Sequence, residues 1–352
     1  MPDVLYVPLL KGRQGEFSAL AEIQPLTRQH ILPLVELVPA PTDDRSSIKA
    51  IVDKSVSKLR TWAGHRLLLD AGYLATEVDL GNQLGAVAYS VMKAHEEGIA
   101  ATPVARLNDE DQALSDAAAI HRDFGGGVSI RLGTEDLEED PEDVVDTLQS
   151  VMSTLGVRAP DVDLVFDLGT IAGDLAVHAG ARFVADLLRN LPTPGDWRQI
   201  VVAGGAFPSD LSSVAAWKLG EFPRYDAQLF DRLLQRRRIP RQPTYGDYAV
   251  AHPELVLGNA FPAPPQLRYT VADRWLVLKG RRNDPRGHDQ FFMVCEHISQ
   301  HPEFVGEALG KADARIAHAK DHGPGNASTW RQIATTHHLD YLVQRLTSLG
   351  EP

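Results

Sequence analysis

The chain has 352 residues, of which 43% are hydrophobic and 23% are charged, and its formal net charge is −12. This composition is typical of a globular protein with a large core, and the acidic balance excludes nucleic-acid binding over the whole surface, because attraction to phosphates scales with the cations presented. The single cysteine, Cys295, excludes a disulfide framework and a multi-cysteine metal site within the chain.

The amino-terminal stretch MPDVLYVPLL has no basic leader, and its apolar run is interrupted by Pro8 and Lys11. No other window approaches the roughly 20 apolar residues that a membrane-spanning helix needs. We therefore expect a soluble, cytoplasmic protein that does not contact the membrane.

Short runs rich in leucine and β-branched residues alternate with helical segments along the first two thirds of the chain. The predicted strands are 5–10, 31–37, 66–70, 101–107, 127–132, 162–167, 199–203 and 245–251. The predicted helices between them include 48–62, 80–95, 109–123, 141–155 and 175–190. Such alternation indicates parallel βαβ units, and the nearly continuous apolar strands are those of a sheet covered on both faces. The pattern predicts an α/β fold, a (β/α)8 TIM-like barrel with its core over about 1–258.

The loop after the first predicted strand reads LLKGRQGEF and contains Gly12 and Gly15. These glycines do not have the GxGxxG spacing of a dinucleotide-binding turn, and they follow the lysine instead of preceding it as in a P-loop. Neither kind of nucleotide site is predicted here.

Charged residues stand at the ends of seven predicted strands. They are Lys11, Glu36, Asp70, Arg106, Arg131, Asp167 and Asp247. Because the carboxyl ends of barrel strands converge on one mouth, we expect these side chains to lie together. One interpretation is a pocket in which the arginines bind phosphate while the carboxylates act as bases or hold a divalent cation. The other is a set of salt bridges that closes the barrel end, and the sequence does not choose between them.

A basic run, QRRRIPR, occupies residues 235–241, just before the eighth predicted strand. It contains Arg236, Arg237, Arg238 and Arg241, and Arg281 and Arg282 follow later in the chain. Arginines at a helix end are favoured by the helix dipole and are commonly solvated. The alternative is a local patch that binds an anionic partner or nucleic acid.

The segment PTYGDYAVAHPE, residues 243–254, places Gly246 and Asp247 between two tyrosines. The tyrosines either pack structurally or line the mouth in contact with a ligand, and the sequence leaves both interpretations open. We predict a structural role for Gly246, which permits close backbone approach or a bulge. Beyond it, QLRYTVADRWLVLKGRR at 266–282 predicts a β-hairpin excursion from the barrel. C-terminal helices are predicted over 288–349, near 290–300, near 303–318 and in the final segment, and we expect the whole chain to form one domain.

The final helix, in GNASTWRQIATTHHLDYLVQRL at 325–346, contains two adjacent histidines, His337 and His338. At about 100° per residue, His337 falls in line with Trp330 and Tyr341. The adjacent spacing differs from the i, i+4 pair of a zinc motif. We predict that Trp330, His337 and His338 are structural residues that dock this helix on the barrel, and we expect no metal site.

Four stretches are similar to a known family when they are taken together: YVPLLKGRQGEFSAL, ILPLVEL, YGDYAVAHPE and GNASTWRQIATTHHLDYLVQRL. The chain resembles the phage and bacterial beta protein family from Tyr6 to Leu346. The resemblance implies a component of a phage immunity cassette that restrains a co-encoded, toxin-like killer protein. It implies no catalytic residues.

Three hypotheses follow. The first is an antitoxin-like component of anti-phage defence that binds the killer protein. The second is a barrel enzyme acting on a phosphorylated small molecule or nucleotide, phosphodiesterase-like and dependent on a divalent cation. The third is a nucleic-acid sensor that uses the basic run. The sequence leaves open whether the protein is catalytic and what ligand it binds.

Overall fold

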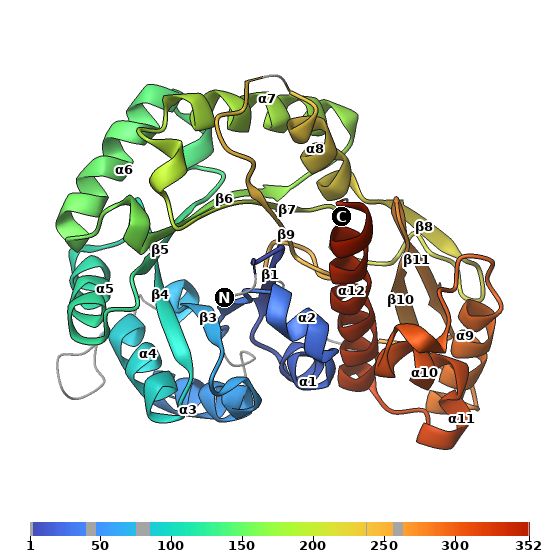
Figure 1. Cartoon of the computed structure of the whole chain (residues 1–352). Coiled ribbons are helices and arrows are strands. Elements are labelled where there is room, and N and C mark those ends of the chain that lie inside the picture. The colour runs from blue at the N-terminus through green and yellow to red at the C-terminus, as the bar shows by residue number, and fades with distance from the viewer. Residues whose placement is uncertain (1–2, 40–46, 75–84, 237, 256–262, 351) are drawn as a thin grey trace.

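Eight parallel strands close into a barrel in the order β1-β2-β3-β4-β5-β6-β7-β9 in a computed structural model (Figure 1). The structure describes residues 3–39, 47–74, 85–236, 238–255, 263–350 and 352. The barrel strands are β1 Tyr6–Lys11, β2 Leu34–Glu36, β3 Arg66–Asp70, β4 Ala100–Arg106, β5 Val128–Leu132, β6 Val162–Thr170, β7 Gln199–Gly205 and β9 Thr244–Asp247. The predicted (β/α)8 barrel is therefore confirmed.

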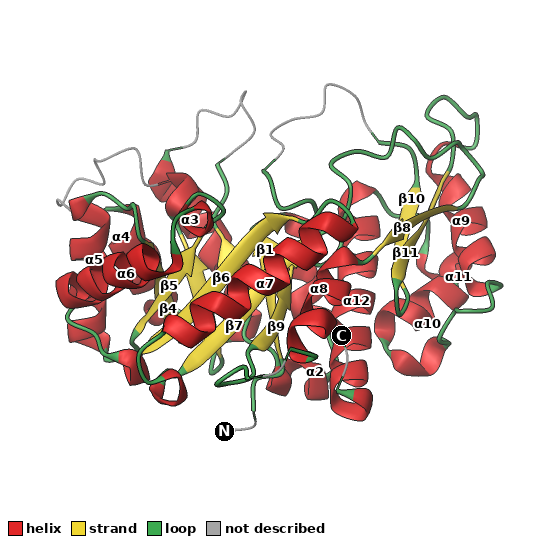
Figure 2. Cartoon of the chain, turned by 90° about the horizontal axis from the view of Figure 1, so that it is seen from above, coloured by secondary structure: helices red, strands yellow, loops and turns green. Residues whose placement is uncertain are grey.

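Helices surround the barrel and connect its strands (Figure 2). They are α1 Gln14–Glu22, α2 Pro25–His30, α3 Ile48–Lys58, α4 Ala86–Glu96, α5 Asp111–Phe124, α6 Pro141–Leu155, α7 Asp174–Asn190 and α8 Tyr225–Leu234. Short 3-10 turns are η1 Leu59–Trp62, η2 Gly72–Leu74, η3 Asp136–Glu138, η4 Ala159–Asp161, η5 Pro194–Asp196, η6 Gly287–Asp289 and η7 Glu307–Leu309. The start of the predicted helix 80–95 lies outside the described residues.

The helix ends follow local chemistry, as α6 illustrates. The side chain of Asp140 accepts a hydrogen bond from the N–H of Glu142, and Pro141 occupies the first turn, where a missing N–H costs nothing. Gly156 ends the helix with a φ of 68°, a left-handed conformation that glycine adopts without strain. These signals explain why the predicted bounds of this helix match the structure.

A second group of elements forms what we call the C-terminal lobe. Its antiparallel sheet has the order β10-β11-β8, with β8 Gly220–Pro223, β10 Gln266–Thr270 and β11 Arg274–Lys279. The helices α9 Gln290–Ser299, α10 Lys311–Ala317 and α11 Ala319–His322 complete the lobe. The predicted hairpin is confirmed, whereas β8, which comes from the connection between β7 and α8, was not predicted.

The predicted helix over 303–318 was wrong in extent. Only Lys311–Ala317 is α-helical, preceded by the turn η7. The reason lies in two glycines, because Gly306 has a φ of 92° and Gly310 is fully extended, so neither continues a right-handed helix.

The last helix, α12 Ala327–Leu349, occupies the position of the eighth barrel helix and packs on α1, α2 and β1. Its first half belongs to the lobe, since Trp330 and Ile333 are buried with lobe residues. Its second half belongs to the barrel, since Leu339 and Leu342 are buried in the layer between strands and helices. Figure 1 shows α12 lying between the barrel and the lobe.

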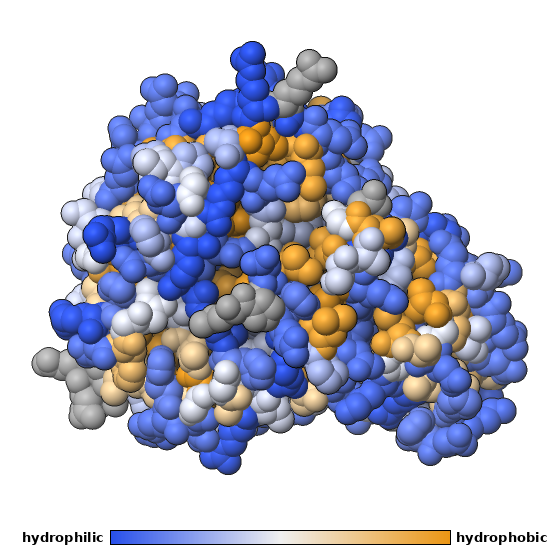
Figure 3. Space-filling model, in the orientation of Figure 1, coloured by the Kyte–Doolittle hydropathy of each residue, from blue (hydrophilic) through white to orange (hydrophobic). Residues whose placement is uncertain are grey.

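The barrel interior holds a separate apolar core, which includes Val7, Leu9, Leu34, Leu68 and Val165. On the face viewed in Figure 3, hydrophilic residues cover most of the surface and the exposed hydrophobic ones form several small groups. Among the described helices, none has the length and apolar character needed to cross a membrane.

Candidate functional site at the barrel mouth

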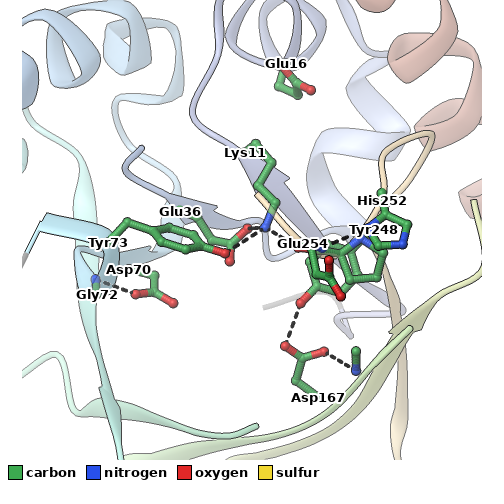
Figure 4. A network of polar contacts seen from close by, with 12 residues as sticks. Lys11, Glu16, Glu36, Asp70, Gly72, Tyr73, Asp167, Tyr248, His252 and Glu254 are labelled. Atoms are coloured by element: carbon green, nitrogen blue, oxygen red, sulfur yellow. Dashed lines mark hydrogen bonds and ion pairs between the residues drawn. The ribbon is translucent and has the colours of Figure 1, made fainter. Parts of the chain in front are cut away.

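Strand register brings three of the predicted charged residues side by side. Lys11 pairs with Glu36 across β1 and β2, and Glu36 pairs with Asp70 across β2 and β3. Because side chains alternate along a strand, each points to the barrel interior like the leucine two residues before it. Figure 4 shows Lys11, Glu36 and Asp167 directed toward a common space at the mouth.

The guanidinium of Arg131 joins the carboxylates of this mouth. Its Nη1 donates to Glu36 at 3.0 Å and to Asp70 at 2.6 Å. Its Nε and Nη2 donate to Asp167 at 3.0 and 2.6 Å, and Nη2 also donates to the hydroxyl of Tyr248 at 2.7 Å. Since a guanidinium has five N–H groups, all of them are used within the protein.

Two aspartates are held by backbone turns at the strand ends. One oxygen of Asp70 accepts the N–H of Gly72 at 2.8 Å, and one oxygen of Asp167 accepts the N–H of Gly169 at 3.0 Å. Burial would raise the pKa of Asp70, but the charges of Arg106 and Arg131 outweigh burial and lower the pKa below its usual value. Asp70 is therefore ionised at neutral pH and pairs with both arginines.

The ammonium of Lys11 is also fully engaged. It lies 2.7 Å from a carboxylate oxygen of Glu36 and donates to the carbonyl of Pro253 at 2.5 Å and to the hydroxyl of Tyr73 at 3.2 Å. The ring centroids of Tyr73 and Tyr248 lie 5.2 and 5.1 Å from the nitrogen, so both aromatic rings lie close to the cation. Lys11 is 4% exposed, which leaves it out of direct contact with solvent.

These ion pairs form the floor of a cavity of about 620 Å³. Its lining residues are Glu36, Gly72, Tyr73, Arg106, Asn108, Asp109, Arg131, Gly133, Thr134, Glu135, Asp136, Asp167, Gly169, Thr170, Tyr248, Pro253 and Glu254. The structure therefore brings six of the seven predicted strand-end residues to one region, with Lys11 and Asp70 beneath the lining.

Asp247 does not join the others, which corrects the expectation that it lies at the mouth. Its neighbour Gly246 faces the barrel interior, where a Cβ atom would lie 3.0 Å from side chains of Val201 and Ala203. Since side chains alternate, Asp247 points outward and accepts hydrogen bonds from the hydroxyls of Tyr6 and Tyr245. The residue that reaches the mouth from this segment is Tyr248.

His338 is the third partner of Asp247. Its Nε2 lies 3.0 Å from Asp247 Oδ2, and its Nδ1 lies 2.8 Å from the hydroxyl of Thr270. Burial would raise the pKa of Asp247, but the charge and hydrogen bond of His338 lower it to about 2. The contact ties α12 to β9 of the barrel and to β10 of the lobe.

His337 lies on the lobe side of the same junction. Its Nδ1 is 2.9 Å from Asp313 on α10, its Nε2 is 2.9 Å from the carbonyl of Thr270, and its ring stacks on Tyr269 at 3.8 Å. The indole N–H of Trp330 donates to the carbonyl of Pro324 at 2.8 Å. Both histidines are fully buried and bound to protein groups on both ring nitrogens.

No group of three or more histidine, cysteine or carboxylate side chains suited to a metal ion occurs in the part of the chain that the structure describes. The nearest approach to a carboxylate cluster is the mouth itself. There Glu36, Asp70 and Asp167 converge on the guanidinium of Arg131 instead of on an open centre.

The basic run is only partly at the surface. Arg241 is half-buried and donates to the carbonyls of Pro194, Trp197 and Arg198, so it fastens its loop to the end of α7 and to β7. Arg236 is half-buried and Arg238 is exposed, with a left-handed φ of 69°. Arg281 and Arg282, just after β11, are exposed as well. Arg237 lies outside the described residues.

Sequence reasoning missed the cavity residues that follow the strands by two to six positions. Asp109 and Asp136 each accept a backbone N–H from the strand end before them, Arg106 and Gly133, at 2.8 Å. A signal for them was present, since a carboxylate three residues later can reach back to a backbone N–H, as it does in a capping box. Tyr248, one of the two tyrosines that flank Gly246 and Asp247, lines the cavity, as one of the two interpretations expected.

The comparison with known families covers nearly the whole chain. Residues 6–344 match the family model described as Beta protein. No curated protein matches the chain.

Proposed function

This chain belongs to the Beta protein family, and from that membership we propose that it is an antitoxin-like component of anti-phage defence. In this role it binds a co-encoded killer protein and holds the killer inactive until infection. The family resemblance motivates the partner, and the geometry of the mouth supports a role in binding over one in chemistry.

The observation that carries the proposal is the saturation of Arg131. All five of its N–H groups bind Glu36, Asp70, Asp167 and Tyr248. A group that stabilises a transition state needs donors directed at the substrate. The charged groups at the base of the cavity pair with one another instead of facing a substrate. This arrangement supports a structural role for them.

Exposed cations on an acidic protein offer a surface for the partner. Arg238 and Arg281 are both exposed, and exposed cations steer association with a partner that carries negative charge. Deleting residues 224–241 is a poor test of this surface, because Arg224 is fully buried and donates to the hydroxyl of Tyr245 at 2.9 Å. Point substitutions avoid that damage.

The test is the survival of cells that express the neighbouring gene with and without this protein. We expect the neighbour to kill alone and this protein to restore growth. If Arg238→Glu combined with Arg281→Glu loses protection while the exposed control Arg122→Glu keeps it, these exposed arginines contribute to docking. A harmless neighbour, or killing that is unaffected by this protein, contradicts the proposed function.

The second hypothesis, an enzyme acting on a phosphorylated small molecule or nucleotide, receives less support. It assigned Arg106 and Arg131 as phosphate clamps, but Arg131 has no N–H left to donate. The cavity lining also carries six carboxylates against two guanidinium groups, and carboxylates repel phosphate. A thermal shift with nucleotides and Mg²⁺ or Mn²⁺ that disappears in Asp167→Asn would restore this hypothesis.

The third hypothesis, a nucleic-acid sensor, loses Arg241 because that side chain is bound to backbone carbonyls. Binding to DNA or RNA that weakens with salt and disappears in Arg238→Glu combined with Arg281→Glu is what this hypothesis requires. Absence of binding at low salt would remove it.

A further inference from the structure

The mouth cavity has two parts with different chemistry. Its floor, formed around Arg131, has no hydrogen-bonding capacity left on the guanidinium. Its wall, formed by the loops after β4 and β5, carries Arg106, Asp109, Glu135 and Asp136. The wall retains donors and acceptors that no described residue uses, and this difference defines where a ligand would bind.

Arg106 supplies the free donors. Its Nη2 binds Asp70 at 2.7 Å, while its Nε and Nη1 form no hydrogen bond with any described residue. The guanidinium lies against the backbone of Gly72, where a Cβ atom would come within 1.7 Å of Nη1. Glycine at this position therefore permits the placement of Arg106 in the wall, and 24% of the arginine side chain is exposed to the cavity.

Asp109 and Asp136 supply the free acceptors. Each uses Oδ2 to accept a backbone N–H at 2.8 Å, and the Oδ1 of each forms no hydrogen bond within the described part of the chain. Burial raises the pKa of both carboxyl groups. A cation placed beside them would compensate for that burial, because an opposite charge favours the ionised carboxylate.

The combination selects against ligands that carry one sign of charge. Inorganic phosphate would meet Arg106 but also Asp109, Glu135 and Asp136 on the same wall. A simple amine would meet the carboxylates but also the guanidinium. A molecule with an anionic group and a cationic group satisfies both, and a cavity of about 620 Å³ holds a molecule the size of an amino acid with room to spare.

We propose that the wall formed by Arg106, Asp109 and Asp136 binds a small zwitterion of the basic amino-acid class. The ligand's carboxylate accepts a free N–H of Arg106 in a charge-assisted hydrogen bond. Its ammonium or guanidinium group donates to the free oxygens of Asp109 and Asp136. This site is separate from the proposed restraint of a killer protein, and either can hold without the other.

The test measures the binding of two matched probes to the full-length protein by isothermal titration calorimetry. L-arginine carries both groups, and agmatine is the same molecule without the carboxylate. We expect L-arginine to bind with an affinity at least about tenfold higher than that of agmatine, because agmatine leaves Arg106 unpaired.

Variants assign the binding to the wall. Arg106→Gln is expected to weaken L-arginine binding at least about tenfold and to remove the preference over agmatine. Asp109→Asn combined with Asp136→Asn keeps an oxygen for each backbone N–H and is expected to weaken both probes. Arg122→Gln, an exposed arginine on α5, is the control that should bind like the unchanged protein. Circular dichroism of each variant checks that the barrel is folded.

Three results would overturn the proposal. They are equal affinity for agmatine and L-arginine, tighter binding of inorganic phosphate than of L-arginine, and no binding of L-arginine at millimolar concentration. Normal binding of L-arginine by a folded Arg106→Gln variant would also overturn it, because the carboxylate would then be bound elsewhere.

Discussion

His337 has an acceptor at each ring nitrogen. Asp313 faces Nδ1 and the carbonyl of Thr270 faces Nε2, both at 2.9 Å. Both ring nitrogens therefore contact protein oxygen atoms, which fixes the orientation of the ring between α10 and β10. The adjacent His338 is held in the same way, by the hydroxyl of Thr270 at Nδ1 and by Asp247 at Nε2.

Replacing His338 with alanine should destabilise the protein by roughly 2 to 4 kcal/mol. The change removes the contact of His338 with Asp247 Oδ2, which keeps only the hydroxyl of Tyr245 as a hydrogen-bond donor, and it leaves the buried hydroxyl of Thr270 without its side-chain partner. Lost hydrogen bonds at buried polar groups are costly. Urea unfolding measures the effect. His318→Ala is the control, since that side chain is exposed and its removal should change stability by no more than about 0.5 kcal/mol. Equal stabilities of the two variants would contradict the role assigned to His338.

Asp340 gives the stability a pH dependence of known sign. It is 3% exposed and accepts hydrogen bonds on one oxygen from Gln24 and Thr27, while its other oxygen has no partner. Burial raises its pKa to about 6. The folded protein therefore binds a proton that the unfolded chain releases near pH 4, and it loses stability as the pH rises through about 4 to 6.

Asp340→Asn should remove this loss. The amide oxygen still accepts from Gln24 and Thr27, so we expect the variant to be more stable than the unchanged protein above pH 6, by roughly 1 to 3 kcal/mol. Unfolding by urea at pH 4.5 and at pH 7.5 measures it, with the exposed Asp146→Asn as control. A variant that is less stable at both pH values would show that the carboxyl group is stabilising instead.

At the scale of elements, β9 shows how tightly the barrel is packed. A Cβ atom on Gly246 would lie 3.0 Å from Val201, Ala203 and the carbonyl of Val7. We expect Gly246→Ala to cost roughly 1 to 3 kcal/mol, because overpacking a filled interior moves the neighbouring strands. The measurement is thermal unfolding, and the control is Gly126→Ala.

The control makes the same glycine-to-alanine change at a position where the added methyl group has room. An added Cβ atom on Gly126 meets no heavy atom within 4 Å, so its substitution should leave stability unchanged or slightly raised. If both alanine variants unfold at the same temperature, the barrel interior at Gly246 accommodates a methyl group, which would contradict the close packing inferred here.

The elements that could be predicted were those with a clear local sequence pattern. The barrel strands were readable because both of their faces are buried, which produces nearly continuous apolar runs. β8 was not readable, because its sequence GEFP is short and none of its residues is fully buried. The helix near 303–318 was overextended because the two glycines that break it carry no apolar signal.

A site residue could be predicted from the sequence where the end of its strand was predicted correctly. Six charged residues were found because each stands at the end of a buried strand, and five of them, all except Arg131, follow an interior apolar residue by two positions. Asp247 was misplaced because the predicted strand ran to residue 251, whereas β9 ends at Asp247 itself with that side chain outward. The pairing of Arg131 with three carboxylates depends on distances across the barrel, which a single sequence does not contain.

At the scale of the whole molecule, α12 makes the barrel dependent on the end of the chain. Leu339 and Leu342 complete the layer of apolar residues outside the strands, and Asp340 binds the start of α2. A fragment of residues 1–258 lacks these contacts and exposes the apolar surface of α1 that they cover.

We expect the 1–258 fragment to lack the fixed packing of the full-length protein. Near-ultraviolet circular dichroism reports this through Trp62 and Trp197, both buried in the barrel layer. Adding a second fragment that contains α12 should restore the signal, which is the control for damage from the cut. A fragment that folds alone with the full signal would make the barrel independent of α12.

The same helix sets an order of events during synthesis. Residues 14–30 leave the ribosome long before residues 327–349, yet the side chains that cover them belong to those later residues. Contacts so distant in sequence form slowly, because a long loop must close before they stabilise anything. During synthesis α1 and α2 are therefore exposed until α12 has been made. We expect chaperones that bind nascent chains to bind this protein at α1 and α2.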